Sequence, residues 1–230
     1  MRIAALAMLG LMATLPARAE QLTVVELFTS QGCNSCPPAD ALLQDLTKRS
    51  DLLPLSLHVD YWDYLGWKDS FSSAWATARQ RGYARTFNSR SAYTPQIVAL
   101  GFGHAVGSDR AEVNRLLTRA GKEPPLDISV AREGAHATIT LPARAKSAGD
   151  VFLAEYAPHR SVKIERGENA GETITYVNIV TRIVKVGVWN GSVTRLRVDL
   201  PADGELAAAI LVQESGQGRM LGAARVPKAG

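Results

Sequence analysis

The sequence predicts an α/β domain followed by a C-terminal antiparallel β-rich, sandwich-like domain, both downstream of a leader peptide. Three observations support this prediction. The first 19 residues run from a basic start through an apolar stretch to small residues, the next part alternates strand-like with helix-like runs, and only short alternating runs follow residue 122. We therefore divide the chain into residues 1–19, 20–122 and 123–230.

The N-terminus has the three parts of a secretory signal peptide. Arg2 makes a basic start, residues 3–15 are almost unbroken apolar, and Ala17-Arg18-Ala19 offers an Ala-x-Ala cleavage site. The apolar run is too short to span a bilayer comfortably, and a short membrane anchor is the alternative. We expect an exported protein, periplasmic or secreted, with no stable membrane insertion after signal cleavage.

Composition and charge argue against a nucleic-acid-binding protein. Hydrophobic residues make up 46% and charged residues 21% of the 230 positions, as in an ordinary soluble protein. Loss of Arg2 and Arg18 with the leader would lower the formal net charge from +4 to +2, and the sequence has no Lys/Arg-rich stripe with interleaved aromatics. Nucleic acid is therefore not an expected partner, and the oligomeric state is left open.

The segment 20–122 alternates strand and helix patterns. Strands are expected at residues 22–28, 53–59, 96–100 and 104–106, and helices at residues 38–48, 71–86 and 109–120. Gly101-Phe102-Gly103 predicts a hairpin between the last two strands, and Asp109 with Glu112 gives the last helix a capping-box-like start. Strand, helix, strand, helix, hairpin and helix is the order of a thioredoxin-like α/β domain.

The run Lys122-Glu123-Pro124-Pro125 breaks this pattern and is the candidate domain boundary. The segment 123–230 then shows short alternating runs separated by Gly, Pro and Asn turns, which favours an antiparallel β domain. Strands are expected at residues 126–130, 135–141, 150–156, 173–180, 194–200 and 207–213.

The two cysteines of the chain, Cys33 and Cys36, form a Cys-x-x-Cys pair between the first strand and the first helix. A structural disulfide is one interpretation in an exported protein. A bridge over so small a loop removes little entropy from the unfolded chain, which argues for a further role. At a helix N-terminus the dipole and free N–H groups favour a thiolate, so Cys33 is the expected attacking residue and Cys36 the resolving one.

Neighbouring residues temper this chemistry. Pro37-Pro38 disfavours helical geometry at Cys36, so the helix is expected to begin one or two residues late. The negative charge of Asp40, one helical turn after Cys36, would disfavour a thiolate if its side chain points back toward the cysteines. A zinc site is the competing interpretation of the motif, but structural zinc needs about four ligands and the histidines are scattered; transient Cu(I) binding is a minority alternative. No cofactor or resident metal is expected.

Two segments resemble the exported proteins grouped as domain of unknown function 1223. These are the run from Val24 to Asp40 around the cysteine pair, and the run from Gly167 to Gly171 followed by residues 176–180. The resemblance covers nearly all of the mature chain and implies a thioredoxin-like domain with a β-rich C-terminal region, without a settled activity. The spacing of the first strand and the cysteine pair also resembles that of glutaredoxins.

The thioredoxin-like pattern implies a partner for the cysteine pair. Thr94-Pro95 matches the cis-proline dipeptide that faces the pair in such proteins, where it is expected to orient a substrate backbone; an ordinary trans-proline is the alternative. Tyr61 and Trp62 follow the second strand, where they form either a ligand wall or a cover over the core.

Two further features have alternative interpretations, and a third has none assigned. Glu26 lies inside the first strand, where it either relays a proton to Cys36 or has a structural role, by pairing with an arginine or reaching the surface. The Gly167–Gly171 run is a tight turn or a loop that packs on the redox edge. His159 has no assigned neighbourhood.

The favoured function is thiol–disulfide exchange with a protein or small-molecule thiol or disulfide. The alternative is a non-catalytic binding or scaffold protein with a static Cys33–Cys36 disulfide. An exposed Cys33 sulfur beside an open groove would favour exchange, and a pair covered by the β-rich region would favour the scaffold.

Overall fold

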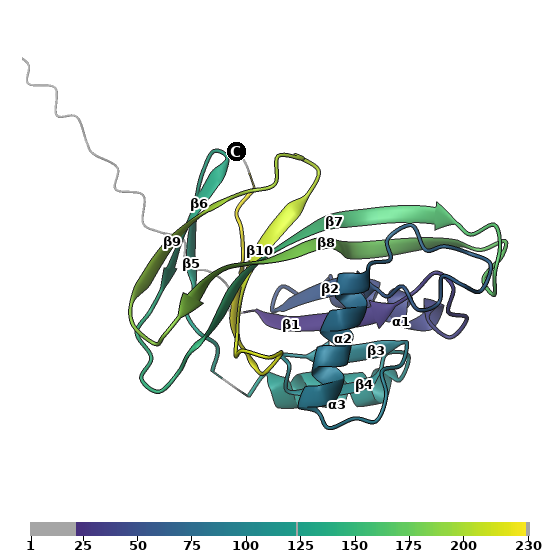
Figure 1. The fold of residues 1–230 in the computed structure, drawn as a ribbon, viewed down its shortest axis with the longest axis horizontal. Coiled ribbons are helices and arrows are strands. Elements are labelled where there is room, and N and C mark those ends of the chain that lie inside the picture. Colours follow the sequence, from purple (N-terminus) through teal and green to yellow (C-terminus); the bar gives the residue numbers. More distant parts are fainter. Residues whose placement is uncertain (1–21, 123, 229–230) are drawn as a thin grey trace, which may run out of the picture.

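The computed structural model describes residues 22–122 and 124–228, which form a mixed eight-stranded sheet, a three-stranded antiparallel sheet and three helices (Figure 1). The helices are α1 (Pro37–Leu46), α2 (Ala74–Thr86) and α3 (Arg110–Ala120). The strands are β1 (Thr23–Thr29), β2 (Leu52–His58), β3 (Gln96–Ala99), β4 (Gly103–Val106), β5 (Ser129–Glu133), β6 (His136–Leu141), β7 (Gly149–Lys163), β8 (Thr173–Trp189), β9 (Thr194–Asp199), β10 (Ala207–Gln213) and β11 (Met220–Arg225). The large sheet has the order β11-β10-β7-β8-β2-β1-β3-β4.

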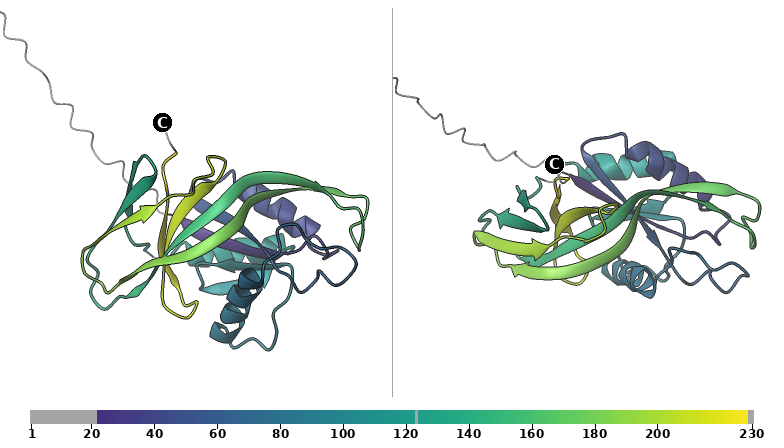
Figure 2. Two further views of the ribbon diagram at one scale, coloured as in Figure 1. Left: turned by 45° about the horizontal axis from the view of Figure 1, so that its top comes forward. Right: turned by 90° about the horizontal axis from the view of Figure 1, so that it is seen from above.

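The N-terminal half of the sheet confirms the predicted alternation of strands and helices. β1 runs parallel to β2 and antiparallel to β3, and β3 and β4 form the predicted hairpin. Helix α2 lies on one face of this part of the sheet, and α1 and α3 lie on the other (Figure 2). The cap of α3 is as predicted, because the Asp109 carboxylate accepts from the backbone N–H of Glu112 at 3.0 Å. Helix α2 begins later than predicted, at Ala74, because the hydroxyl of Ser73 caps it.

The C-terminal strands extend this sheet. β7 and β8 form a long antiparallel hairpin, and β8 pairs in parallel with β2 at Ser56 and Ile179. β10 then pairs antiparallel with residues 150–156 of β7, and β11 pairs antiparallel with β10. The division of the chain at residue 122 stays a prediction, and the sheet continues across it.

The small sheet β5-β6-β9 packs over the β7, β10 and β11 part of the large sheet. A second hydrophobic core lies between the two sheets, with Ile139, Leu153, Ile210 and the fully buried Trp189 among its members. Each layer presents every second side chain to this core, so the C-terminal half has the sandwich-like arrangement of two β-layers.

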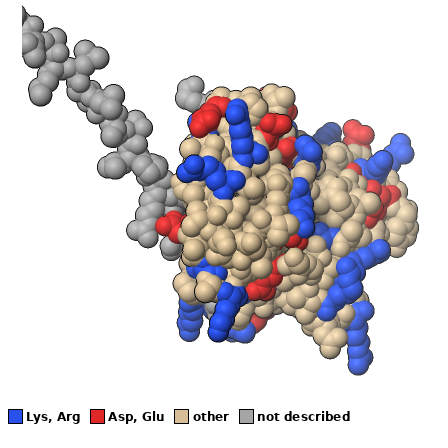
Figure 3. Space-filling view, turned by 60° about the vertical axis from the view of Figure 1, so that its left-hand side comes forward, with Lys and Arg blue, Asp and Glu red and all other residues tan. Residues whose placement is uncertain are grey.

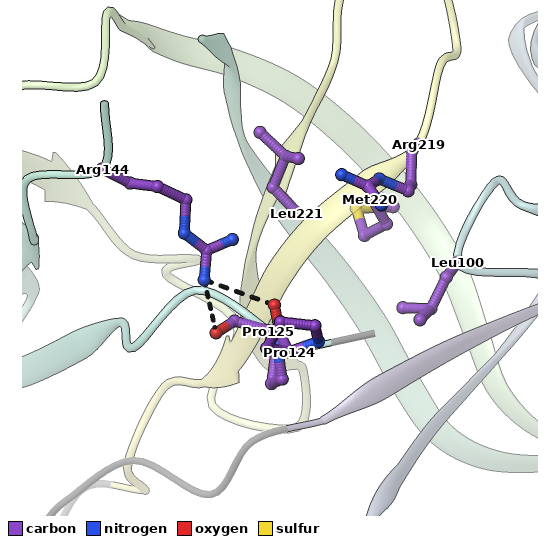
Figure 4. A pocket seen from close by; sticks show the side chains of 7 residues that line it. All are labelled: Leu100, Pro124, Pro125, Arg144, Arg219, Met220 and Leu221. Atoms are coloured by element: carbon purple, nitrogen blue, oxygen red, sulfur yellow. Dashed lines mark hydrogen bonds between the residues drawn. The ribbon is translucent and has the colours of Figure 1, made fainter. Parts of the chain in front are cut away.

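Residues 124–126, which follow the predicted boundary, are hydrogen-bonded to the C-terminal half. The backbone N–H of Leu126 donates to the carbonyl of Leu221 at 2.7 Å. The guanidinium of Arg144 donates to the carbonyls of Pro124 and Pro125, at 3.3 and 2.9 Å (Figure 4). Pro124 and Pro125 thus pack with the C-terminal half of the chain.

Two differences from the sequence prediction matter for function. β7 and β8 run well beyond the predicted ends at residues 156 and 180, and β11 is an additional strand. The extra residues of β7, 157–163, pair with residues 173–179 of β8 and form an arm that reaches along the sheet to the end where α1 begins (Figure 1). No helix in the described part of the chain is long and apolar enough to cross a membrane, and the predicted leader lies outside the described residues.

Charges of both signs are interspersed on the face seen in Figure 3, where Lys and Arg side chains alternate with Asp and Glu. This pattern is typical of a solvated surface and does not form a single-signed field over that face.

Candidate functional site

The cysteine pair forms a disulfide at the N-terminus of α1. Cys33 and Cys36 are bonded with their Cα atoms 5.4 Å apart. Cys36 is the N-cap residue in helical geometry, and its carbonyl accepts from the N–H groups of Ala39 and Asp40. The expectation of a late helix start is therefore wrong. Pro37 and its neighbour occupy the first helical positions, where no N–H is needed.

Thr94 and Trp62 face the Cys33 sulfur. The Thr94 hydroxyl donates to Cys33 Sγ at 3.4 Å, and the indole N–H of Trp62 donates to the same hydroxyl at 2.8 Å. The Thr94–Pro95 peptide bond is cis, as predicted. Trp62 thus lies near the cysteine pair and orients the Thr94 hydroxyl, which contacts Cys33 Sγ.

The tip of the β7–β8 arm packs against the loop that carries Cys33. The side-chain amide of Asn169 donates to the carbonyls of Gln31 and Cys33, at 2.9 and 3.0 Å. The Glu168 carboxylate accepts from the backbone N–H of Asn34 at 3.3 Å. Both cysteines are 0% exposed. The Gly167–Gly171 run therefore packs on the cysteine loop, and both of its glycines have positive φ, as a tight turn requires.

The turn before Cys33 is held by the segment that follows β2. The carboxylate of Asp69 accepts from the backbone N–H of Gln31 at 2.8 Å, and the indole N–H of Trp67 donates to the Gln31 side chain at 2.8 Å. The loop that carries Cys33 is therefore hydrogen-bonded both to this segment, through Gln31, and to the arm, through Asn169.

A buried carboxyl group lies one helical turn after Cys36. Asp40 is 4% exposed, and burial raises its pKa to about 7, against the opposing effects of His58 and of a hydrogen bond from Thr29. The Thr29 hydroxyl donates to Oδ2 at 3.2 Å, while Oδ1 has no hydrogen-bond partner in the described residues. Asp40 can therefore hold or release a proton near neutral pH, one helical turn after Cys36.

A buried His–Asp pair lies next to Asp40. His58 Nδ1 is 2.7 Å from Asp69 Oδ2, and His58 Nε2 has no partner among the described residues. Burial opposes ionisation of Asp69, but His58 and the backbone N–H groups of Gln31 and Phe71 outweigh it and lower the pKa of Asp69. Tyr176 of β8 packs edge-on against His58, and burial together with the charges of the two aspartates raises its pKa. The arm thus closes this polar cluster as well.

Glu26 has the second of its two expected roles. Its carboxylate accepts from Arg79 Nε at 2.5 Å and from the hydroxyl of Tyr83, and Arg79 also donates to the Gln213 side chain. Glu26 and Arg79 are both buried. The network links β1, α2 and β10, so Glu26 joins the two halves of the molecule.

The remaining sequence candidates lie apart from this cluster. His159 is exposed on the β7–β8 arm, opposite Val177. Within residues 22–122 and 124–228, no group of three or more His, Cys, Asp or Glu side chains is placed to hold a metal ion.

Comparison with known proteins identifies the family. Residues 24–213 match the family described as "Protein of unknown function (DUF1223)". The chain belongs to the DUF1223 family. A solved structure similar to this DUF1223 chain is that of protein AGR_C_4864 from Agrobacterium tumefaciens, with 32% identity, a TM-score of 0.77, and coverage of 94% of this chain and 97% of that one.

A more distant likeness concerns the fold alone. HBP35 of Porphyromonas gingivalis is 14% identical to the DUF1223 chain with a TM-score of 0.63, over 91% of this chain and 76% of that one. No curated protein matches the sequence.

Sequence reasoning missed the roles of two residues. Asn169 stands in the middle of the Gly167–Gly171 signature, and an amide between glycines was the available signal. Asp40 was noted only as a charge that could oppose a thiolate. Its charge acts on Tyr176, more than a hundred positions away in the sequence, and the local pattern gave no sign of that proximity.

Proposed function

We propose that this protein performs thiol–disulfide exchange through Cys33 and Cys36 on a thioredoxin-like unit, in a compartment outside the cytoplasm. The observation that carries the proposal is the position of two functional groups, a hydroxyl and a carboxyl, relative to the disulfide. A hydroxyl donor, Thr94, contacts the Cys33 sulfur, and a carboxyl group that titrates near neutral pH, Asp40, lies one turn after Cys36. The partner is a protein or small-molecule thiol or disulfide, and the predicted leader supports export.

Topology supports the thioredoxin-like assignment. The N-terminal half runs β1-α1-β2-α2-β3-β4-α3, with strand order β2-β1-β3-β4 and only β1 and β2 parallel. The cysteine pair follows β1 and begins α1, which is the edge where ligands bind in open α/β sheets.

The exchange step balances as follows. A substrate thiolate attacks Cys33 Sγ, the Cys33–Cys36 bond breaks, and its electron pair goes to the Cys36 sulfur, which takes the proton held by Asp40. A second substrate thiolate then attacks the mixed disulfide and releases Cys33 as a thiolate, which takes up a proton. The substrate loses two electrons and becomes a disulfide, and the protein pair gains them. The reverse sequence reduces a substrate disulfide.

The burial of Cys33 and Cys36 favours a second candidate function, that of a scaffold protein with a static disulfide. Cys33 is 0% exposed, and a substrate sulfur cannot reach it while the arm tip is closed. The arm tip holds the cysteine loop through three hydrogen bonds, two from Asn169 and one to Glu168. Because a net hydrogen bond stabilises by only about 1 kcal/mol, local opening of the tip lies within reach of ordinary fluctuations. Exchange therefore requires the tip to open, and the static scaffold does not.

The experiment uses Cys36→Ser and Cys33→Ser variants, each expressed with the native leader. Exchange predicts that Cys36→Ser accumulates a mixed disulfide in the native compartment and with oxidised glutathione in vitro, because the resolving thiol is missing. Cys33→Ser is the matched control and should accumulate far less. Absence of any mixed disulfide on Cys36→Ser, in a variant that folds like the wild type, would refute exchange and support the scaffold.

A further inference from the structure

A groove with three arginines opens beside the residues that contact the disulfide. It lies between the outer face of α2 and the segment that connects α2 to Thr94. The arginine groove, as we call it, is lined by Tyr61, Arg81, Ala84, Arg85, Ser89, Arg90, Ser91 and Ala92. Arg81 and Arg85 are one helical turn apart on α2, and Arg90 faces them from the connecting segment. Both elements therefore present cations to one space.

These three arginines are free to bind an anion. All three are exposed, and none forms an ion pair or a side-chain hydrogen bond with a described residue. Other surface arginines do pair with carboxylates, as Arg110 does with Asp45 and Arg160 with Glu205. Guanidinium groups that converge on a groove without a carboxylate partner favour a ligand that supplies carboxylates, which they bind bidentately.

Tyr61 connects the groove to the residues around the disulfide. Tyr61 lines the groove, and its hydroxyl donates to the Gln80 side chain at 3.1 Å. Gln80 in turn donates to the carbonyl of Tyr93 at 2.7 Å, directly before Thr94. Burial raises the pKa of the Tyr61 hydroxyl, while Gln80, Thr94 and Arg81 oppose this, so the hydroxyl lies near both Thr94 and an arginine of the groove.

Trp62 makes the second connection. It donates to Thr94, and its Cβ lies 3.3 Å from the position that a Cβ on Gly32 would occupy, so it packs against the residue before Cys33. The path from the arginine groove to the Cys33 sulfur is thus continuous through Tyr61, Trp62 and Thr94.

We propose that the arginine groove binds the carboxylates of the exchange substrate, so that the protein selects thiols and disulfides that carry negative charge. This inference rests on the proposed exchange function and names its substrate class. The ligand chemistry is a carboxylate group close to a sulfur atom, which occurs in small carboxylate-bearing thiols and in acidic cysteine peptides.

The test separates binding from exchange. Binding is measured by calorimetry on the oxidised wild type with two unreactive probes, S-methylglutathione and a peptide in which glutamates flank S-methylcysteine. The test variant is Arg81→Gln/Arg85→Gln/Arg90→Gln, and the matched control is Arg110→Gln/Arg115→Gln/Arg119→Gln on α3. We expect the wild type and the control to bind at least one probe, and the test variant to lose about tenfold or more in affinity, with binding that weakens as salt rises.

The two probes also distinguish the source of the ligand. Tighter binding of S-methylglutathione supports a small substrate, and tighter binding of the peptide supports a protein segment. Binding of neither probe, or equal binding by the test variant and the wild type, would overturn the arginine groove. Exchange rates are then compared for reduced glutathione and the neutral 2-mercaptoethanol. A preference for glutathione that disappears only in the test variant supports the inference. If the probes bind but neither thiol reacts, exchange is refuted, whereas carboxylate binding by the groove is not.

Discussion

The side-chain amide of Asn169 donates to the backbone carbonyl of Cys33 at 3.0 Å, although 136 positions separate the two residues in the sequence. The bond brings the tip of a long C-terminal hairpin onto the cysteine loop of the N-terminal half. The surroundings of the disulfide therefore include a segment from the C-terminal half of the chain.

Removal of this contact is expected to expose the disulfide. Asn169→Ala loses two hydrogen bonds, worth roughly 1–3 kcal/mol together, and should speed reduction of the disulfide by dithiothreitol about tenfold. Glu172→Ala, an exposed change at the same end of the arm, is the matched control and should leave the rate unchanged. Equal rates for Asn169→Ala and the wild type would show that the tip does not control access.

Asp40 is expected to make stability fall as pH rises. Burial raises its folded pKa to about 7 from an ordinary value of 3.8, so its stability contribution is complete below about pH 3.8 and is lost as pH rises through about 7. A shift of this size corresponds to on the order of 4 kcal/mol. Asp40→Asn should therefore be more stable than the wild type at pH 8, with the gain shrinking toward pH 4.

Urea unfolding at pH 4, 6 and 8, with the disulfide intact, measures this difference. The comparison isolates Asp40 because other titrating groups, such as Asp69, are present in both proteins. A difference between Asp40→Asn and the wild type that stays constant with pH would contradict the assignment.

Glu26 is expected to be a major determinant of stability. Glu26→Gln leaves the buried Arg79 without its counter-charge and should lower the free energy of unfolding by about 3 kcal/mol or more. The same change at the exposed Glu112, which pairs with Arg115, should cost less than about 1 kcal/mol. Chemical denaturation of both variants measures the contrast, and a similar small loss in both would argue against the buried network.

The Thr94 hydroxyl is expected to favour the reduced Cys33 thiolate. Thr94→Val keeps the side-chain shape but removes the donor to sulfur, and should lower the rate of iodoacetamide alkylation of the reduced protein at pH 7 about fivefold, the factor for a net hydrogen bond of about 1 kcal/mol. Thr94→Ser restores a hydroxyl and should recover most of the rate. If valine and serine variants react alike, the hydroxyl has no such role.

Local patterns predicted the N-terminal half well because its elements carry their signals nearby. The apolar run of β1, the Asp109 cap and the hairpin glycines each determine structure within a few residues. The placement of Cys33 and Cys36 between β1 and α1 follows from the same local order.

The C-terminal arm was predicted too short for physical reasons. The pairing of β7 with β8 shifts register near Val151 and near Glu155, which interrupts the two-residue alternation on which strand prediction rests. Beyond Ala157, much of β7 is exposed, so its side chains carry no strong apolar pattern. β11 was missed because Gly222 interrupts a short run, where the backbone of Leu126 approaches closely.

The burial of the site likewise depends on contacts that no local pattern records. Asn169 contacts the cysteine loop, and Tyr176 lies near Asp40, across more than a hundred positions of sequence in each case. The sequence could identify the cysteine pair, but not the cover over it or the proton-holding group beside it.

The reduction potential of the Cys33–Cys36 pair tests the central claim most directly. Wild-type protein is equilibrated in glutathione and dithiothreitol buffers of defined potential, and the fractions of oxidised and reduced protein are measured by alkylation and mass spectrometry. Exchange predicts a reversible two-electron transition with a midpoint above about −300 mV, within the range of cellular thiol couples. A pair that stays oxidised well below about −300 mV would be a structural disulfide and would contradict the account.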